Sequence, residues 1–79
     1  MSHSLESVKM LLTQFIASIK RIDPATAKAK QLRHMKKTND TFQRLVKKYG
    51  SLEHASPKDL DVIYNALADY YRKWIGPLP

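Results

Sequence analysis

The sequence contains no cysteine among its 79 residues. This absence excludes disulfide bonds and zinc sites built on thiolates, two common means of stabilising a chain of this size. It also excludes a nucleophilic cysteine. A domain this small therefore depends on a well-organised hydrophobic core. The composition fits a reducing compartment.

Glycine is almost as scarce, because only Gly50 and Gly76 occur. A phosphate-binding loop needs several glycines that let the backbone approach its ligand, so this class of nucleotide site is excluded. The four prolines stand at positions 24, 57, 77 and 79. Together these residues leave three long uninterrupted stretches, each of which predicts a helix.

Long apolar runs are also missing, so no transmembrane segment is expected. The N-terminus, Met1-Ser2-His3-Ser4, lacks the basic start and apolar run of a secretory signal. These features predict a soluble, cytoplasmic protein.

Residues suited to catalysis or metal binding form no recognisable group. His3, His34 and His54 fall at a terminus, on a polar helix face and in a loop, and no helix carries a His-x-x-x-His pair. Asp59 and Asp61 are two residues apart, so on a helix they point in different directions. We therefore expect no enzymatic activity, no metal and no cofactor.

Apolar residues recur every three or four positions in each long stretch, which is the pattern of one buried helix face. The first helix is expected over residues 5–22, the second over 24–49 and the third over 57–75, with a short proline-containing tail at 76–79. Ser4, Asp23 and Ser56 are the expected N-caps, and Pro24 and Pro57 occupy first helical positions. The apolar row of the second helix comprises Leu32, Met35, Phe42, Val46 and Tyr49, with Asn39 as its one polar member.

Two interpretations of Asn39 remain. A continuous second helix would carry this polar residue in its core seam, at a cost in stability. Alternatively, the chain breaks near Thr38 and Asn39, and Asp40 with Gln43 caps a further helix. The periodicity stays in phase across the junction, which favours the continuous helix.

The expected architecture is all-α, an up-down-up three-helix bundle in a single domain over residues 1–79, or four helices if the middle one breaks. A second helix over 24–49 would be about 39 Å long, against about 27 Å for its neighbours. The overhang would kink or be buried against a second copy, so a homodimer is one expectation.

Positive charge is concentrated on the expected second helix. The chain has 14 Lys and Arg against 7 Asp and Glu, a net charge of +7, and residues 24–49 hold eight of these cations but only one acid, Asp40. At 100° per residue, seven of the cations fall within a sector of roughly 120° opposite the apolar row. This basic ridge, about 25 Å long at 1.5 Å per residue, consists of Lys30, Arg33, Lys36, Lys37, Arg44, Lys47 and Lys48.

The basic ridge predicts a non-enzymatic module that binds nucleic acid at its phosphates, with little sequence specificity. The alternative is a protein-interaction module, such as an inhibitor, an immunity protein or a small regulator. It would dock an acidic partner on the same ridge, or an apolar partner on the third helix. There Tyr64, Tyr71 and Ile75 share one face and are the candidate partner-binding residues.

Overall fold

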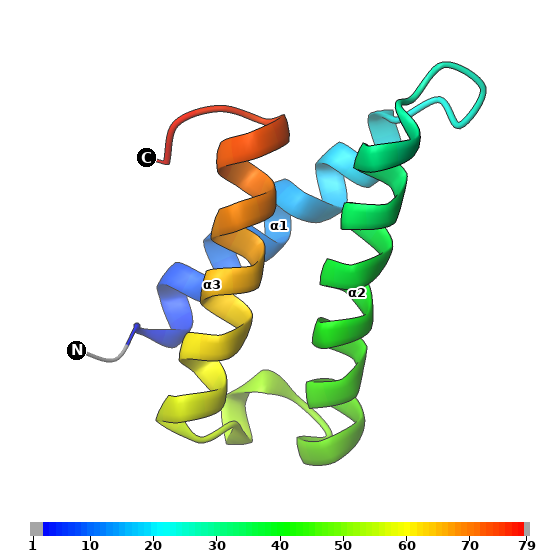
Figure 1. The fold of residues 1–79 in the computed structure, drawn as a ribbon. Helices are drawn as coiled ribbons and strands as arrows, with labels where there is room; N and C mark the ends of the chain where they lie inside the picture. The colour runs from blue at the N-terminus through cyan, green and yellow to red at the C-terminus, as the bar shows by residue number, and fades with distance from the viewer. Residues whose placement is uncertain (1–2, 79) are drawn as a thin grey trace.

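The computed structural model describes residues 3–78, in which helices pack against one another and no strand occurs. Three α-helices run up, down and up: α1 (Leu5–Arg21), α2 (Ala29–Tyr49) and α3 (Pro57–Trp74) (Figure 1). A short 3-10 helix, η1 (Leu52–His54), connects α2 to α3. The predicted three-helix bundle is therefore confirmed. The four-helix alternative is wrong, because α2 passes through Asn39 unbroken.

Two of the helix starts are set locally by serine. The Ser4 hydroxyl accepts a hydrogen bond from the Ser7 backbone N–H at 3.2 Å, and the Ser56 hydroxyl accepts one from the Asp59 N–H at the same distance. These bonds satisfy backbone donors that have no partner inside the helix. The helices end at Arg21 and Trp74, each followed by an isoleucine that serves as the C-cap residue. Pro79, the last residue of the expected tail, lies outside the described residues.

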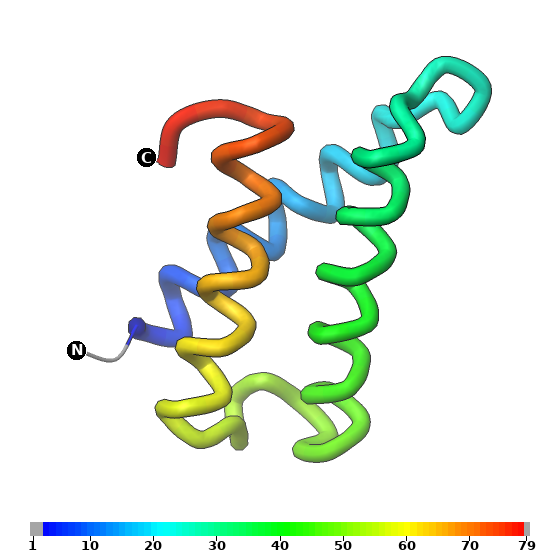
Figure 2. The backbone as a smooth tube through the Cα atoms, in the orientation of Figure 1, coloured from blue at the N-terminus to red at the C-terminus, as the bar shows by residue number. Residues whose placement is uncertain are grey.

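The start of α2 differs from the expectation. The helix begins at Ala29 rather than at Pro24, because Asp23 closes a turn of its own. Its carboxylate accepts from the Ala25 N–H at 2.9 Å, and its carbonyl accepts from the N–H groups of Thr26 and Ala27. Such local bonds compete with a helix for the same backbone groups. The resulting turn projects from the end of the bundle (Figure 2).

This turn also removes most of the expected overhang. The helix α2 has 21 residues, against 17 in α1 and 18 in α3. It ends at Gly50, whose φ of +81° is a left-handed conformation that favours glycine. The Gly50 N–H bonds to the Val46 carbonyl at 2.7 Å and closes the last turn.

The core lies mainly between α1 and α3. The helix α3 packs against both other helices, whereas α1 and α2 make little contact with each other. The buried apolar side chains come mostly from α1 and α3, and α2 supplies only one of them. They are Val8, Leu11, Phe15, Leu45, Leu52, Ile63, Leu67, Ala68 and Tyr70.

The face that α2 turns to the core is shifted to one side of the predicted apolar row, although Met35, Phe42 and Tyr49 of that row also pack against the core while partly buried. Its buried residues are Thr38 and Leu45, and each precedes a member of that row by one position. One position corresponds to about 100° around the helix, so the fully buried residues lie to one side of the row. Asn39 is half-buried, and Thr38 is the buried polar residue, with its hydroxyl donating to the His34 carbonyl at 2.9 Å.

Buried aromatic groups on α3 give a physical reason for this shift. The hydroxyl of Tyr70 and the indole N–H of Trp74 need hydrogen-bond partners when they are taken from water. Gln31 donates to the Tyr70 hydroxyl at 3.4 Å, and His34 accepts from the Trp74 N–H at 2.9 Å. Both partners lie on the Thr38 side of α2, so satisfying these groups turns this side toward α3.

Candidate nucleic-acid interface

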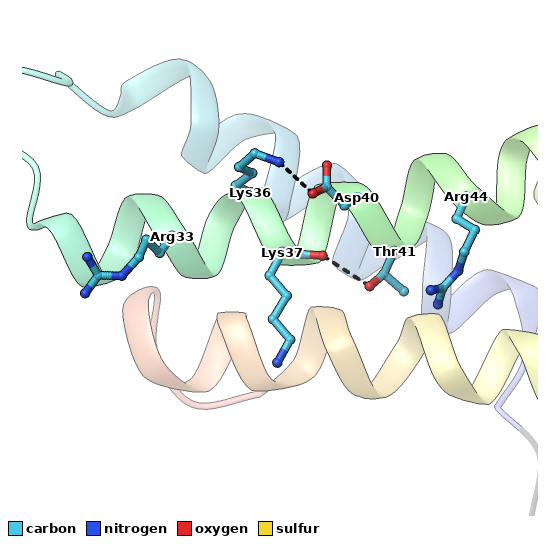
Figure 3. Close-up of a pocket in the computed structure, with 6 residues that line it drawn as sticks. All are labelled: Arg33, Lys36, Lys37, Asp40, Thr41 and Arg44. Atoms are coloured by element: carbon cyan, nitrogen blue, oxygen red, sulfur yellow. Dashed lines mark hydrogen bonds and ion pairs between the residues drawn. The ribbon is translucent and has the colours of Figure 1, made fainter.

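All seven residues of the basic ridge lie on α2, and all seven are exposed. Six side chains of α2 line a shallow depression of about 600 Å³ along this face: Arg33, Lys36, Lys37, Asp40, Thr41 and Arg44. Figure 3 shows Lys37 and Arg44 projecting to one side of the helix and the Lys36–Asp40 pair to the other. The structure thus brings four of the predicted cations around one surface.

Two of the seven cations are paired with acids. Lys36 Nζ lies 2.8 Å from Asp40 Oδ2 within α2, and Lys48 Nζ lies 3.3 Å from Asp59 Oδ2 on α3. The other five form no ion pair within residues 3–78: Lys30, Arg33, Lys37, Arg44 and Lys47. These five unpaired cations are the ones most available to an external anion.

The C-terminal end of the ridge is anchored by Asp59. The Tyr49 hydroxyl donates a short hydrogen bond to the Asp59 carboxylate, and this bond, followed by those from Lys48 and Ser56, lowers the pKa of Asp59. The bonds to Asp59 and Tyr49 raise the pKa of Lys48 in turn. Lys48 therefore serves to hold α2 against α3, and its charge is partly balanced there.

His34 does not lie on a solvated polar face without a partner, as its position in the sequence suggested. It is half-buried between α2 and α3, where its Nδ1 accepts from Trp74 and its ring meets the Tyr70 ring edge-on at 5.3 Å. Burial lowers the pKa of His34, and the positive charges of Lys73 and Lys37 lower it further, against the opposing effect of Asp69. The neutral form of the side chain is thereby favoured.

The candidate partner-binding residues, two on α3 and one at its C-cap, are half-buried. Tyr64, Tyr71 and Ile75 all pack against the core cluster. The ring of His3 stacks on Tyr64, with centroids 3.5 Å apart and an angle of 11° between the planes. Each of the three side chains is therefore partly covered by the protein itself.

Thr41 also lines the depression, although it is uncharged and was therefore not among the predicted ridge residues. It lies four residues beyond Lys37, and its hydroxyl donates to the Lys37 carbonyl at 3.1 Å. At 100° per residue, Thr41 lies at the edge of the sector that holds the cations. Helical geometry applied to all polar residues, and not to cations alone, would therefore have predicted its position.

Within residues 3–78, no three histidine or carboxylate side chains lie close enough together to hold a metal ion. None of the helices described is long and apolar enough to cross a membrane.

Comparison with protein-family models, with curated proteins and with solved structures finds no match to this chain.

Proposed function

We propose that this chain is a non-enzymatic module that binds nucleic acid through the basic ridge, mainly at phosphates. One observation supports this most strongly: five exposed cations without ion-pair partners among the described residues share a single face of α2. Phosphate contacts position a protein without reading bases, so little sequence specificity is expected along the ridge.

The length of the ridge suits a nucleic-acid backbone. From Lys30 to Lys47 it extends about 26 Å along the helix axis at 1.5 Å per residue. At 3.4 Å per base pair this equals roughly seven or eight base pairs. Several phosphates of one strand can therefore approach the ridge together.

The like charges on α2 repel one another in the free protein. Arg33 and Lys37 are four residues apart, as are Arg44 and Lys48, and such pairs destabilise a helix. Lys36 and Arg44 each stand four residues from Asp40, and of these two attractive pairs the Lys36–Asp40 ion pair is formed. An anionic partner would relieve the repulsion, which is a reason for a sequence to retain it.

A salt titration tests the proposal. The protein is added to fluorescein-labelled duplex DNA, duplex RNA and single strands, and anisotropy is followed as salt rises. Five phosphate contacts predict a slope of about −4.5 for log K against log salt on duplex DNA. A flat salt dependence, or no binding near physiological salt, contradicts the proposal.

A matched pair of triple variants locates the interface. Arg33→Gln, Lys37→Gln and Arg44→Gln together remove three ridge charges and should reduce the slope by about 3. The control triple replaces Lys20, Arg21 and Lys58 by Gln, which removes the same charge from exposed positions off the ridge. An equal reduction of the salt slope in both triple variants would show that net charge, rather than the ridge, drives binding.

A protein-interaction module is the second candidate. An acidic protein surface would satisfy the same cations. An apolar groove of about 300 Å³ also lies where α1, α2 and η1 meet, lined in part by Leu12, Phe42 and Val46. Ridge-dependent binding to polyglutamate, without binding to any nucleic acid at about 0.15 M salt, would favour this candidate. Both candidate functions are compatible with a cytoplasmic location. Light scattering would detect a homodimer.

A further inference from the structure

A second, polar pocket lies beside the ridge, in the seam between α2 and α3. It has a volume of about 160 Å³ and is lined by His34, Lys37, Thr38, Thr41, Ala66 and Asp69. At about 30 Å³ for each water in the liquid, it has room for several water molecules or for one edge of a purine base. Ala66 keeps the pocket open because its side chain is small.

The pocket adjoins the phosphate-binding surface directly. Lys37 and Thr41 line both the ridge depression and the polar pocket. Figure 3 shows the Lys37 side chain extended from α2 on this side. A nucleotide whose phosphate lies on the ridge therefore has its base within reach of the pocket.

The hydrogen bonds already made inside the protein define what the pocket offers. The hydroxyls of Thr38 and Thr41 donate to backbone carbonyls of α2. Because the indole of Trp74 can only donate, Nδ1 of His34 must be its acceptor, and the neutral ring carries its proton on Nε2. The polar groups that remain for a ligand are the donors of His34 and Lys37 and the carboxylate of Asp69.

Asp69 is the distinctive member of this set, since it is the one acid in the lining. It accepts from Arg72 Nη2 at 2.9 Å through Oδ1, and 65% of its side chain is exposed. A carboxylate has about four lone-pair sites, so one such bond leaves it able to accept more. In a site that binds only phosphate, this negative charge would repel the ligand.

Guanine matches the pattern of a carboxylate beside an ammonium. Its Watson–Crick edge places two adjacent donors, N1–H and the N2 amino group, next to the acceptor O6. Adenine and cytosine each present one donor beside a ring acceptor on this edge, and thymine or uracil presents one donor between two carbonyls. The other bases would therefore turn an acceptor toward Asp69.

We infer that this pocket receives the Watson–Crick edge of a guanine from a single strand whose phosphates lie on the basic ridge. Asp69 accepts from N1–H and N2–H, and Lys37 donates to O6. The edge is free only in unpaired nucleic acid, so the site selects single strands or loops. The inference rests on the proposed function, and it adds one base-reading position to an otherwise unspecific surface.

Single-stranded oligothymidines that carry one central guanine, inosine or adenine test the inference by anisotropy. Guanine is expected to bind about fivefold to tenfold more tightly than inosine, which lacks the N2 amino group, and than adenine. Asp69→Asn should abolish this preference while leaving the affinity for plain oligothymidine no lower. The matched control is Asp40→Asn, which removes a helical carboxylate of similar exposure, 60%, that is also ion-paired but lies outside the pocket.

The outcomes separate the two proposals. Equal affinity of the wild-type protein for the guanine, inosine and adenine strands overturns the guanine site and leaves the ridge intact. Absence of binding to every single strand overturns the guanine site, and absence of binding to the duplexes as well overturns the proposed function. A guanine preference that survives Asp69→Asn in a variant with a native circular dichroism spectrum also overturns the site. If that variant does not fold, the comparison of guanine with inosine on the wild-type protein still decides.

Discussion

Charge reversal at Arg33 should stabilise the free protein while it weakens nucleic-acid binding. Arg33 is exposed and stands four residues before Lys37 on α2, without an ion-pair partner among residues 3–78. Arg33→Glu replaces this repulsive pair by an attractive one, with the acid in the favourable N-terminal position. Each of the two changes is worth about 0.2–0.5 kcal/mol, so the unfolding free energy should rise by about 0.5–1 kcal/mol.

Thermal unfolding followed by circular dichroism measures this gain. For a domain of this size, about 0.5–1 kcal/mol corresponds to a rise in Tm of about 2–8 °C. The gain should vanish in about 1 M salt, where the Debye length falls to about 3 Å. Gln14→Glu on α1 is the control, because position 14 is exposed and has no charged residue three or four positions away.

An unchanged or lower Tm for Arg33→Glu at low salt would refute the electrostatic reasoning. It would mean that the ridge charges are already screened or relaxed in the free protein. The ridge charges would then give no reason to expect an anionic partner that offsets their repulsion. A gain in stability without any loss of binding would instead remove Arg33 from the interface.

Three further predictions concern the packing of α2 and the core. Because the pKa of His34 is lowered from 6.5, the unfolded state takes up its proton first, so stability should fall as pH drops below about 6.5. His34→Gln should flatten that slope in urea titrations, and equal slopes would refute the assignment. Tyr49→Phe removes the donor to Asp59 and should cost about 0.5–1.5 kcal/mol in urea unfolding, whereas an unchanged midpoint would show that the bond contributes nothing. Leu67→Ala, at a side chain only 1% exposed, should cost about 2–5 kcal/mol, and a loss under about 1 kcal/mol would mean that the site collapses around the cavity.

Much of the fold could be predicted because its signals are local. The Ser4 and Ser56 caps act on backbone groups three residues away, and Gly50 ends α2 by its own conformation. The spacing of apolar residues along each stretch then indicates three amphipathic helices. The placement of the cations on one face of α2 follows from the same helical geometry, and all seven are exposed as predicted.

The shift of the buried face of α2 could not be predicted in this way. The spacing of apolar residues predicted that Asn39 faces the core, whereas Thr38 is the buried residue in the structure. The deciding contacts join His34 to Trp74, 40 residues along the chain, and Gln31 to Tyr70, 39 residues along. A helix that contributes one buried apolar residue is oriented by such polar partners as much as by its apolar stripe.

The sequence by itself therefore determined that the chain forms three helices, how α1 and α3 begin and where the positive charge gathers. Local spacing pairs Lys36 with Asp40, whereas tertiary structure decided that Lys48 is also paired, because it brings Asp59 on α3 beside Lys48. It also created the polar pocket, since Asp69 and Thr41 meet there from different helices. The positions of residues around one helix follow from backbone geometry. A site between two helices depends instead on hydrogen bonds and packing between side chains that are distant in the sequence.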